Sequence, residues 1–177
     1  MDISSQNHDS FFRLHYLEKK YHLIAFIESK EFKGYNISDN KLSWELDEII
    51  NQNFEILIIG NYIDRSINQK VHHKIHWIGK IDNDLMLSEL INCADLLVLP
   101  SRIDNLPQTG LEAQACGLPI VAFDTNGIKD LVEHKVDGYL AKPYDTKSIK
   151  DGIEWILNEL DVSNDLFKST SLLSIHV

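Results

Sequence analysis

Short apolar runs alternate with longer amphipathic stretches along most of this chain. The apolar runs have the length and composition of buried strands, and we predict strands over residues 21–27, 54–59, 74–78, 95–99 and 120–123. A turn at Asp137-Gly138 predicts a sixth, short edge strand. The stretches between them predict helices over about 38–51, 82–93, 108–116, 127–133 and 145–160. Strands and helices that alternate at this spacing predict an α/β fold, a single Rossmann-like domain with a doubly wound parallel sheet.

The chain has 177 residues, enough for one domain with a substantial core. We assign residues 21–160 to that domain, residues 1–20 to a polar N-terminal segment or linker remnant, and residues 161–177 to a tail. Apolar residues make up 44% and charged residues 25%, as in an ordinary soluble globular protein. The net charge of −10 argues against nucleic acid or an anionic membrane as the main partner.

The sequence carries no signal for a membrane span or for secretion. No apolar run approaches the roughly 20 residues that a spanning helix needs, and the first residues lack the pattern of a signal peptide. The two cysteines, Cys93 and Cys116, lie in helical apolar patterns and are expected to be reduced core residues. We therefore expect a cytoplasmic protein with at most peripheral membrane contact.

Polar residues concentrate between the strand over 95–99 and the strand over 120–123. Pro107 suits the first turn of the helix in this stretch, and Gly117 suits the position just after its end. A helix that begins there directs free N–H groups and the positive end of its dipole at the preceding loop. An anion such as a diphosphate would fit at that point.

Two carboxylates flank the start of this helix. Asp104 in the loop and Glu112 in the helix are separated by seven residues. Carboxylates so placed could accept hydrogen bonds from the hydroxyls of a sugar and of a ribose. Alternatively, Asp104 and Asn105 cap the helix and Glu112 is a solvated helix residue. The spacing alone favours neither interpretation.

The string SRIDNLPQTGLEAQACGLPIVAFDTNGIKDLV resembles the donor-site signature of the family 4 retaining glycosyltransferases of the GT-B fold. That signature is Glu, seven residues, Glu, then A-x-A-x-G-x-P and a Gly-rich turn. Asp104 stands at the first Glu, as in a subgroup with a D-N-L-P string, and Glu112 is the second. The further matches are Ala113, Ala115, Gly117 and Pro119, with Asn126-Gly127 where the family commonly has Gly-Gly. The resemblance covers about residues 20–160.

The resemblance implies a nucleotide-sugar-binding domain, the C-terminal half of an enzyme of polysaccharide or glycoconjugate synthesis. A UDP-sugar or GDP-sugar is implied as the substrate, with no cofactor and no metal. Asp104 would contact the donor sugar and Glu112 the ribose. Lys33-Gly34 corresponds to a phosphate-binding pair after the first strand, without the arginine that usually precedes it. The expected nucleotide-sugar-binding residues are Lys33, Gly34, Gly79, Arg102, Asp104, Asn105, Leu106, Pro107, Gln108, Thr109 and Glu112.

Three further features have competing interpretations. In similar proteins the loop over 78–81 passes the nucleotide base, whereas Trp77 beside it is expected in the core. Arg102 could bind phosphate or pair with Asp104. Three nearby histidines could form a metal site. The neighbouring sequence has no carboxylate or cysteine at a spacing suitable for metal ligands, so we favour solvated histidine side chains. These histidines are His72, His73 and His76.

Members of the resembled family have two Rossmann-like domains that face each other across a cleft. The N-terminal domain binds the acceptor and commonly supplies a catalytic histidine, and only the C-terminal domain is matched here. We therefore expect a fragment, split subunit or remnant whose partner is a separate acceptor-binding domain or subunit, and which alone transfers no sugar. The alternatives are a non-catalytic nucleotide-sugar-binding or regulatory module, and an α/β domain with a vestigial crevice.

Overall fold

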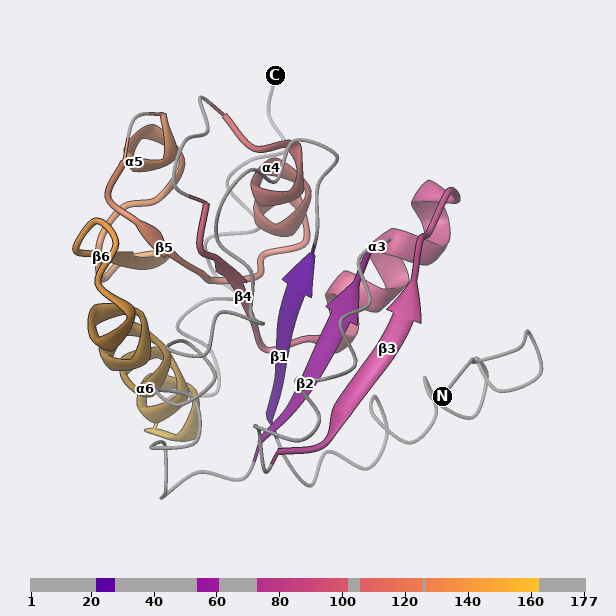
Figure 1. The fold of residues 1–177 in the computed structure, drawn as a ribbon, viewed down its shortest axis with the longest axis horizontal. Helices are drawn as coiled ribbons and strands as arrows, with labels where there is room; N and C mark the ends of the chain where they lie inside the picture. Colours follow the sequence, from indigo (N-terminus) through magenta and orange to yellow (C-terminus); the bar gives the residue numbers. More distant parts are fainter. Residues whose placement is uncertain (1–21, 28–53, 61–72, 102–105, 126, 163–177) are drawn as a thin grey trace.

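The computed structural model describes residues 22–27, 54–60, 73–101, 106–125 and 127–162. These residues form one parallel sheet with helices on both faces (Figure 1). The strands are β1 (His22–Ile27), β2 (Phe54–Ile59), β3 (Ile75–Gly79), β4 (Leu96–Leu99), β5 (Ile120–Phe123) and β6 (Gly138–Ala141). The described helices are α3 (Asp84–Cys93), α4 (Gln108–Ala115), α5 (Ile128–Leu131) and α6 (Thr146–Val162).

The order of the strands creates a switch point in the middle of the sheet. The six strands lie in the order β3-β2-β1-β4-β5-β6, so the predicted doubly wound parallel sheet is confirmed. β1 and β4 are neighbours, with Ile24 paired to Leu96 and Ala25 to Leu97. The direction in which strands are added reverses between these two. Open α/β sheets bind ligands beyond the carboxyl ends of the strands at such a point.

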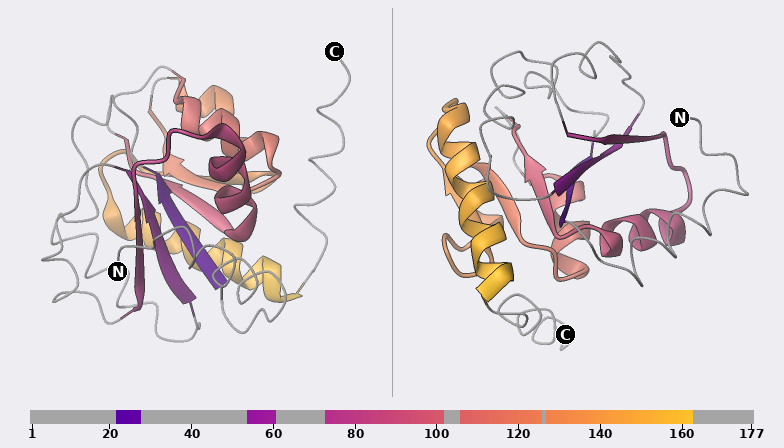
Figure 2. Two further views of the ribbon diagram at one scale, coloured as in Figure 1. Left: turned by 90° about the vertical axis from the view of Figure 1, so that its right-hand side faces the viewer. Right: turned by 90° about the horizontal axis from the view of Figure 1, so that it is seen from below.

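Alternating residues of β2, β4 and β5 supply two separate cores. Val121 and Phe123 of β5 pack against Ile149 and Ile153 of α6 on one face of the sheet. The intervening Ala122 belongs to the core on the other face. Figure 2 shows α6, in yellow, on one side of the sheet and α3 on the other. That second core is completed by residues of three helices: Leu90 of α3, Ala113 of α4, and Ile128 and Leu131 of α5. Strands buried on both faces explain why the sequence reads as continuous apolar runs.

Local sequence signals place most helix ends as predicted. Asn83 caps α3 by accepting a hydrogen bond from the Met86 N–H at 3.0 Å. Gly117 follows α4 with φ of 71°, the left-handed conformation expected of a residue just after a helix. The helix predicted over 127–133 is shorter, because Val132 adopts an extended conformation with φ of −118° and ψ of 123°. The helix predicted over 38–51 lies outside the described residues.

Several smaller expectations can be compared with the structure. Trp77 is buried, as predicted. Cys93 is buried and Cys116 is half-buried. α6 extends to Val162, two residues into the stretch assigned to the tail. None of the described helices is both long enough and apolar enough to cross a membrane.

Candidate functional site

α4 begins at the carboxyl edge of the sheet, beside the switch point, because it follows β4 after a short loop. Pro107 is the N-cap residue, with φ of −66° and ψ of 123°, and so precedes the first turn in which we predicted it. Its carbonyl oxygen accepts hydrogen bonds from the N–H groups of Gly110 (2.9 Å) and Leu111 (3.2 Å). Proline has no side-chain oxygen with which to cap the helix. Among the described residues, no side chain therefore caps the first N–H groups of α4.

Thr109 brings a buried hydroxyl group to the same helix end. The residue is 7% exposed, and its Oγ1 has no hydrogen-bond partner among the described residues. A buried hydroxyl without a partner is unfavourable by about 1–3 kcal/mol. Such a group gains from any ligand that brings an acceptor to it.

Glu112 lies one turn further along α4 and is half-buried. The side-chain amide of Gln108 donates a hydrogen bond from Nε2 to Glu112 Oε1 at 2.9 Å. A carboxylate has about four acceptor sites on two oxygens, so one hydrogen bond leaves capacity for further donors. The carboxylate is thus held near the start of the helix and can accept hydroxyl groups.

Gly79 ends β3 at the same edge of the sheet, but β2 and β1 lie between β3 and β4. Its φ is +80°, and a Cβ added there would meet no atom of the described residues within 4 Å. The carbonyl oxygen of Gly79 accepts a hydrogen bond from the Gly60 N–H at 2.9 Å. In the loop that follows, Lys80 forms an ion pair with Asp82. That the loop over 78–81 passes the nucleotide base remains a prediction.

The structure brings five of the predicted residues together at the start of α4. They are Leu106, Pro107, Gln108, Thr109 and Glu112, of which Leu106 is 51% exposed. The predicted Lys33, Gly34, Arg102, Asp104 and Asn105 lie outside the described residues, and their roles remain predictions.

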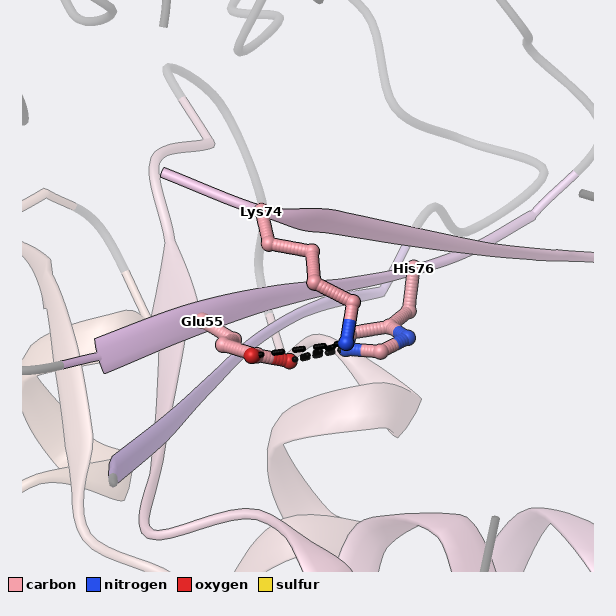
Figure 3. A network of polar contacts seen from close by, with 3 residues as sticks. All are labelled: Glu55, Lys74 and His76. Carbon is pink, nitrogen blue, oxygen red and sulfur yellow. Dashed lines mark hydrogen bonds and ion pairs between the residues drawn. The ribbon is translucent and has the colours of Figure 1, made fainter. Parts of the chain in front are cut away.

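A second polar cluster lies towards the amino ends of β2 and β3 (Figure 3). It consists of Glu55 of β2, His76 of β3, and Lys74 just before β3. The His76 Nε2 bonds to a carboxylate oxygen of Glu55, and Lys74 Nζ lies 3.2 Å from the same oxygen. The prediction of solvated histidines is wrong for His76, whose side chain is 11% exposed. His73 is half-buried and stacks on Phe54 with ring centroids 3.7 Å apart, and His72 lies outside the described residues.

Sequence reasoning missed Glu55 because it stands inside the apolar run FEILII. A single carboxylate within a predicted buried strand was the available signal, since such a group needs a partner. Among the described residues, no three His, Cys, Asp or Glu side chains gather as metal ligands would.

Curated relatives with sequence similarity include glycosyltransferases. An uncharacterized glycosyltransferase of Methanocaldococcus jannaschii is 32% identical over 89 residues, which is 50% of this chain and 23% of that protein. The N,N'-diacetylbacillosaminyl-diphospho-undecaprenol alpha-1,3-N-acetylgalactosaminyltransferase of Campylobacter jejuni is 30% identical over 97 residues, 55% of this chain and 25% of that protein. The matched part of the chain thus spans about a quarter of the length of these relatives.

Solved structures with the same fold include GT-B glycosyltransferases. The Alr3699/HepE protein of Anabaena, solved in complex with UDP, superposes with a TM-score of 0.72 at 17% identity. The alignment covers 97% of this chain and 48% of that one. Sucrose-phosphate synthase of Thermosynechococcus elongatus gives a TM-score of 0.72 at 20% identity, over 92% of this chain and 43% of its own.

The sequence pattern of the glycosyl transferases group 1 matches residues 41–159. That range is more than half of the chain, and it includes α4 with the residues gathered at its start. The chain therefore belongs to the glycosyl transferases group 1 family.

Proposed function

We propose that this chain is the nucleotide-sugar-binding domain of a retaining glycosyltransferase, the C-terminal half of a GT-B enzyme of the D-N-L-P subgroup. It would act in the cytoplasm in polysaccharide or glycoconjugate synthesis. The observation that carries the proposal is the start of α4. Within the part of the chain that the structure describes, no side chain caps this helix end and the Thr109 hydroxyl has no hydrogen-bond partner, and the Glu112 carboxylate lies beside them. Family membership and the UDP complex of a structural neighbour support it.

Each group at this helix end suits one part of a sugar nucleotide. The diphosphate would lie at the N-terminus of α4, where the helix dipole favours an anion by about 0.3–1 kcal/mol. The Thr109 hydroxyl would donate to a phosphate oxygen, and Glu112 would accept the ribose hydroxyls. Lys33 and Arg102 would add positive charge for the phosphates, and Asp104 would hold the sugar.

The chemistry of transfer needs an acceptor as well as a donor. In a retaining reaction of this type, the leaving phosphate oxygen can accept the proton of the incoming hydroxyl, so this domain need supply no nucleophile. The acceptor must be held within about 3–3.5 Å of the anomeric carbon, away from water. We propose that a separate acceptor-binding domain or subunit provides that second wall, and that this chain alone transfers no sugar.

Calorimetry with UDP and GDP, each with and without EDTA, tests the proposed site. We expect saturable binding that does not depend on a divalent metal. Thr109→Val should weaken it about two- to tenfold, because the variant loses one hydrogen bond to the phosphate. Thr146→Val is a matched control, since Thr146 at the start of α6 is also buried and also lacks a partner among the described residues. It should bind like the wild type.

Two results would contradict the proposal. One is an absence of nucleotide binding by a folded wild-type chain, and the other is a strict requirement for Mg²⁺ or Mn²⁺. Turnover then separates the two functional classes: a glycosyltransferase forms product when the acceptor-binding partner is added, whereas a non-catalytic binding module does not. Robust transfer by the chain alone would show that its acceptor site lies within these residues.

A further inference from the structure

Gln108 and Glu112 form a pair on one side of α4. They are the first and fifth residues of the helix, and side chains four apart in a helix are neighbours. Long helical side chains point back towards the helix N-terminus, so the Glu112 carboxylate reaches towards the turn that holds Gln108. The resulting hydrogen bond from Gln108 Nε2 to Glu112 Oε1 is 2.9 Å long.

This hydrogen bond restricts the rotation of the Glu112 side chain. Glu112 is the one acidic residue between Leu106 and Pro119, so no other carboxylate of α4 can take its place. A glutamate loses considerable rotamer freedom when a ligand orders it. A partner that orders it beforehand reduces that loss and so strengthens binding.

The other glutamine of α4 serves a different purpose. The Gln114 amide donates to the backbone carbonyl of Leu131, and so joins α4 to α5. Gln108 forms no hydrogen bond to another described helix, and its side chain is exposed at the end of α4. Its described side-chain partner is Glu112.

From this geometry we infer that Gln108 is a positioning residue, which holds the Glu112 carboxylate so that its remaining acceptor sites face the ribose hydroxyls. The inference rests on the proposed function, in which Glu112 binds the ribose. Gln108 then acts through Glu112 and does not itself bind the diphosphate.

The test compares Gln108→Met with the wild type by calorimetry, using UDP and 2′,3′-dideoxy-UDP. Methionine has the length and helix propensity of glutamine but no donor. We expect UDP affinity to fall about three- to tenfold, as for the loss of one hydrogen bond to a charged group, and dideoxy-UDP affinity to stay unchanged. In a Glu112→Ala background, Gln108→Met should have no further effect on UDP binding. Lys150→Met removes the partner of Glu154 on α6, an equally spaced pair, and should bind UDP like the wild type.

The outcomes separate this inference from the function on which it rests. A folded wild-type chain that does not bind UDP would overturn the proposed function and the inference together. Wild-type binding with an unchanged Gln108→Met variant would overturn the inference alone. An equal loss for UDP and dideoxy-UDP, or an undiminished effect in the Glu112→Ala background, would also overturn it, because Gln108 would then contact the ligand directly.

Discussion

His76 of β3 bonds through Nε2 to the carboxylate of Glu55 on the neighbouring strand β2 (Figure 3). Their side chains are 11% and 14% exposed. The two residues are diagonal neighbours, since His76 pairs in register with Leu57. The contact therefore joins β3, the strand at one edge of the sheet, to β2.

This pair predicts a pH dependence of stability. Burial acts to raise the pKa of Glu55, but the hydrogen bonds and charges of His76 and Lys74 outweigh it and hold that pKa below the ordinary value of 4.5. A lowered carboxyl pKa stabilises the folded state above pH 4.5, and the contribution is lost as the pH falls through the lower, folded-state value. Glu55→Gln should lower the free energy of unfolding by about 1–2 kcal/mol at pH 7 and flatten its decline in acid.

Urea unfolding of both chains between pH 3 and pH 7 measures this effect. Glu89→Gln, at an exposed position of α3, is the control and should follow the wild type. An acid decline as steep in Glu55→Gln as in the wild type would show that other groups cause it.

Replacing Gly138 or Gly110 by alanine should lower the free energy of unfolding by different amounts. A Cβ at Gly138 would clash with the backbone carbonyl of Ile120 on β5 and lie 2.8 Å from Val132 Cγ1. A Cβ at Gly110 would clash with Cδ2 of Leu131, the end of a side chain that can rotate. Gly138→Ala should therefore lower the free energy of unfolding by about 2–4 kcal/mol. Gly110→Ala should cost less, because alanine also favours the helix by about 1 kcal/mol.

Thermal unfolding of the two variants ranks these costs. Leu131→Val removes the methyl group that would clash with a Cβ at position 110. Leu131→Val should therefore lower the stability of Gly110→Ala by less than it lowers the stability of the wild type. If the two glycine variants proved equally stable, the close contact at the backbone of β5 would not be a feature of the folded protein.

Glu112 and Asp104 should respond differently to two ligands. In the proposed site Glu112 holds the ribose and Asp104 the sugar, so Glu112→Gln should weaken the binding of both UDP and a UDP-sugar. The loss of a charged hydrogen bond costs on the order of 1.5–3 kcal/mol. Asp104→Asn should weaken the binding of the UDP-sugar and leave the binding of UDP unchanged. Calorimetry with both ligands checks this, and equal effects of the two variants on plain UDP would contradict the assigned roles.

We predict that the charge of Asp137 can be removed without loss of stability. Burial raises the pKa of Asp137 above its usual 3.8 and the charge of Glu133 raises it further, against a hydrogen bond from the Glu133 N–H. That bond, from Glu133 N to Asp137 Oδ1, is 2.7 Å long. A raised carboxyl pKa favours folding below the usual value, and this contribution is lost as the pH rises through the folded-state value.

Asp137→Asn keeps the accepting oxygen and removes the repulsion. It should be at least as stable as the wild type at pH 7, whereas Asp137→Ala should lose about 0.5–1.5 kcal/mol. Denaturant titration of the three chains measures the difference. A marked loss of stability in Asp137→Asn would mean that the charge itself stabilises the turn before β6.

Features that depend on near neighbours in the chain could be predicted from the sequence. The apolar run 54–59, the Asn83 cap and the left-handed Gly117 all follow from side-chain spacing or from the conformational preferences of single residues. The string from Ser101 to Val132 also sufficed to indicate the family. The predicted sheet type followed from the alternation of strands and helices.

Features that join distant segments were decided by the tertiary structure. Glu55 and His76 meet because β2 and β3 pair in a particular register, which spacing along the chain does not specify. Thr109 was a candidate from its place in the sequence, but its burial depends on how α4 packs on the sheet. A hydrogen bond between strands or a buried hydroxyl exists only after the chain has folded, whereas periodicity and caps are set within a few residues.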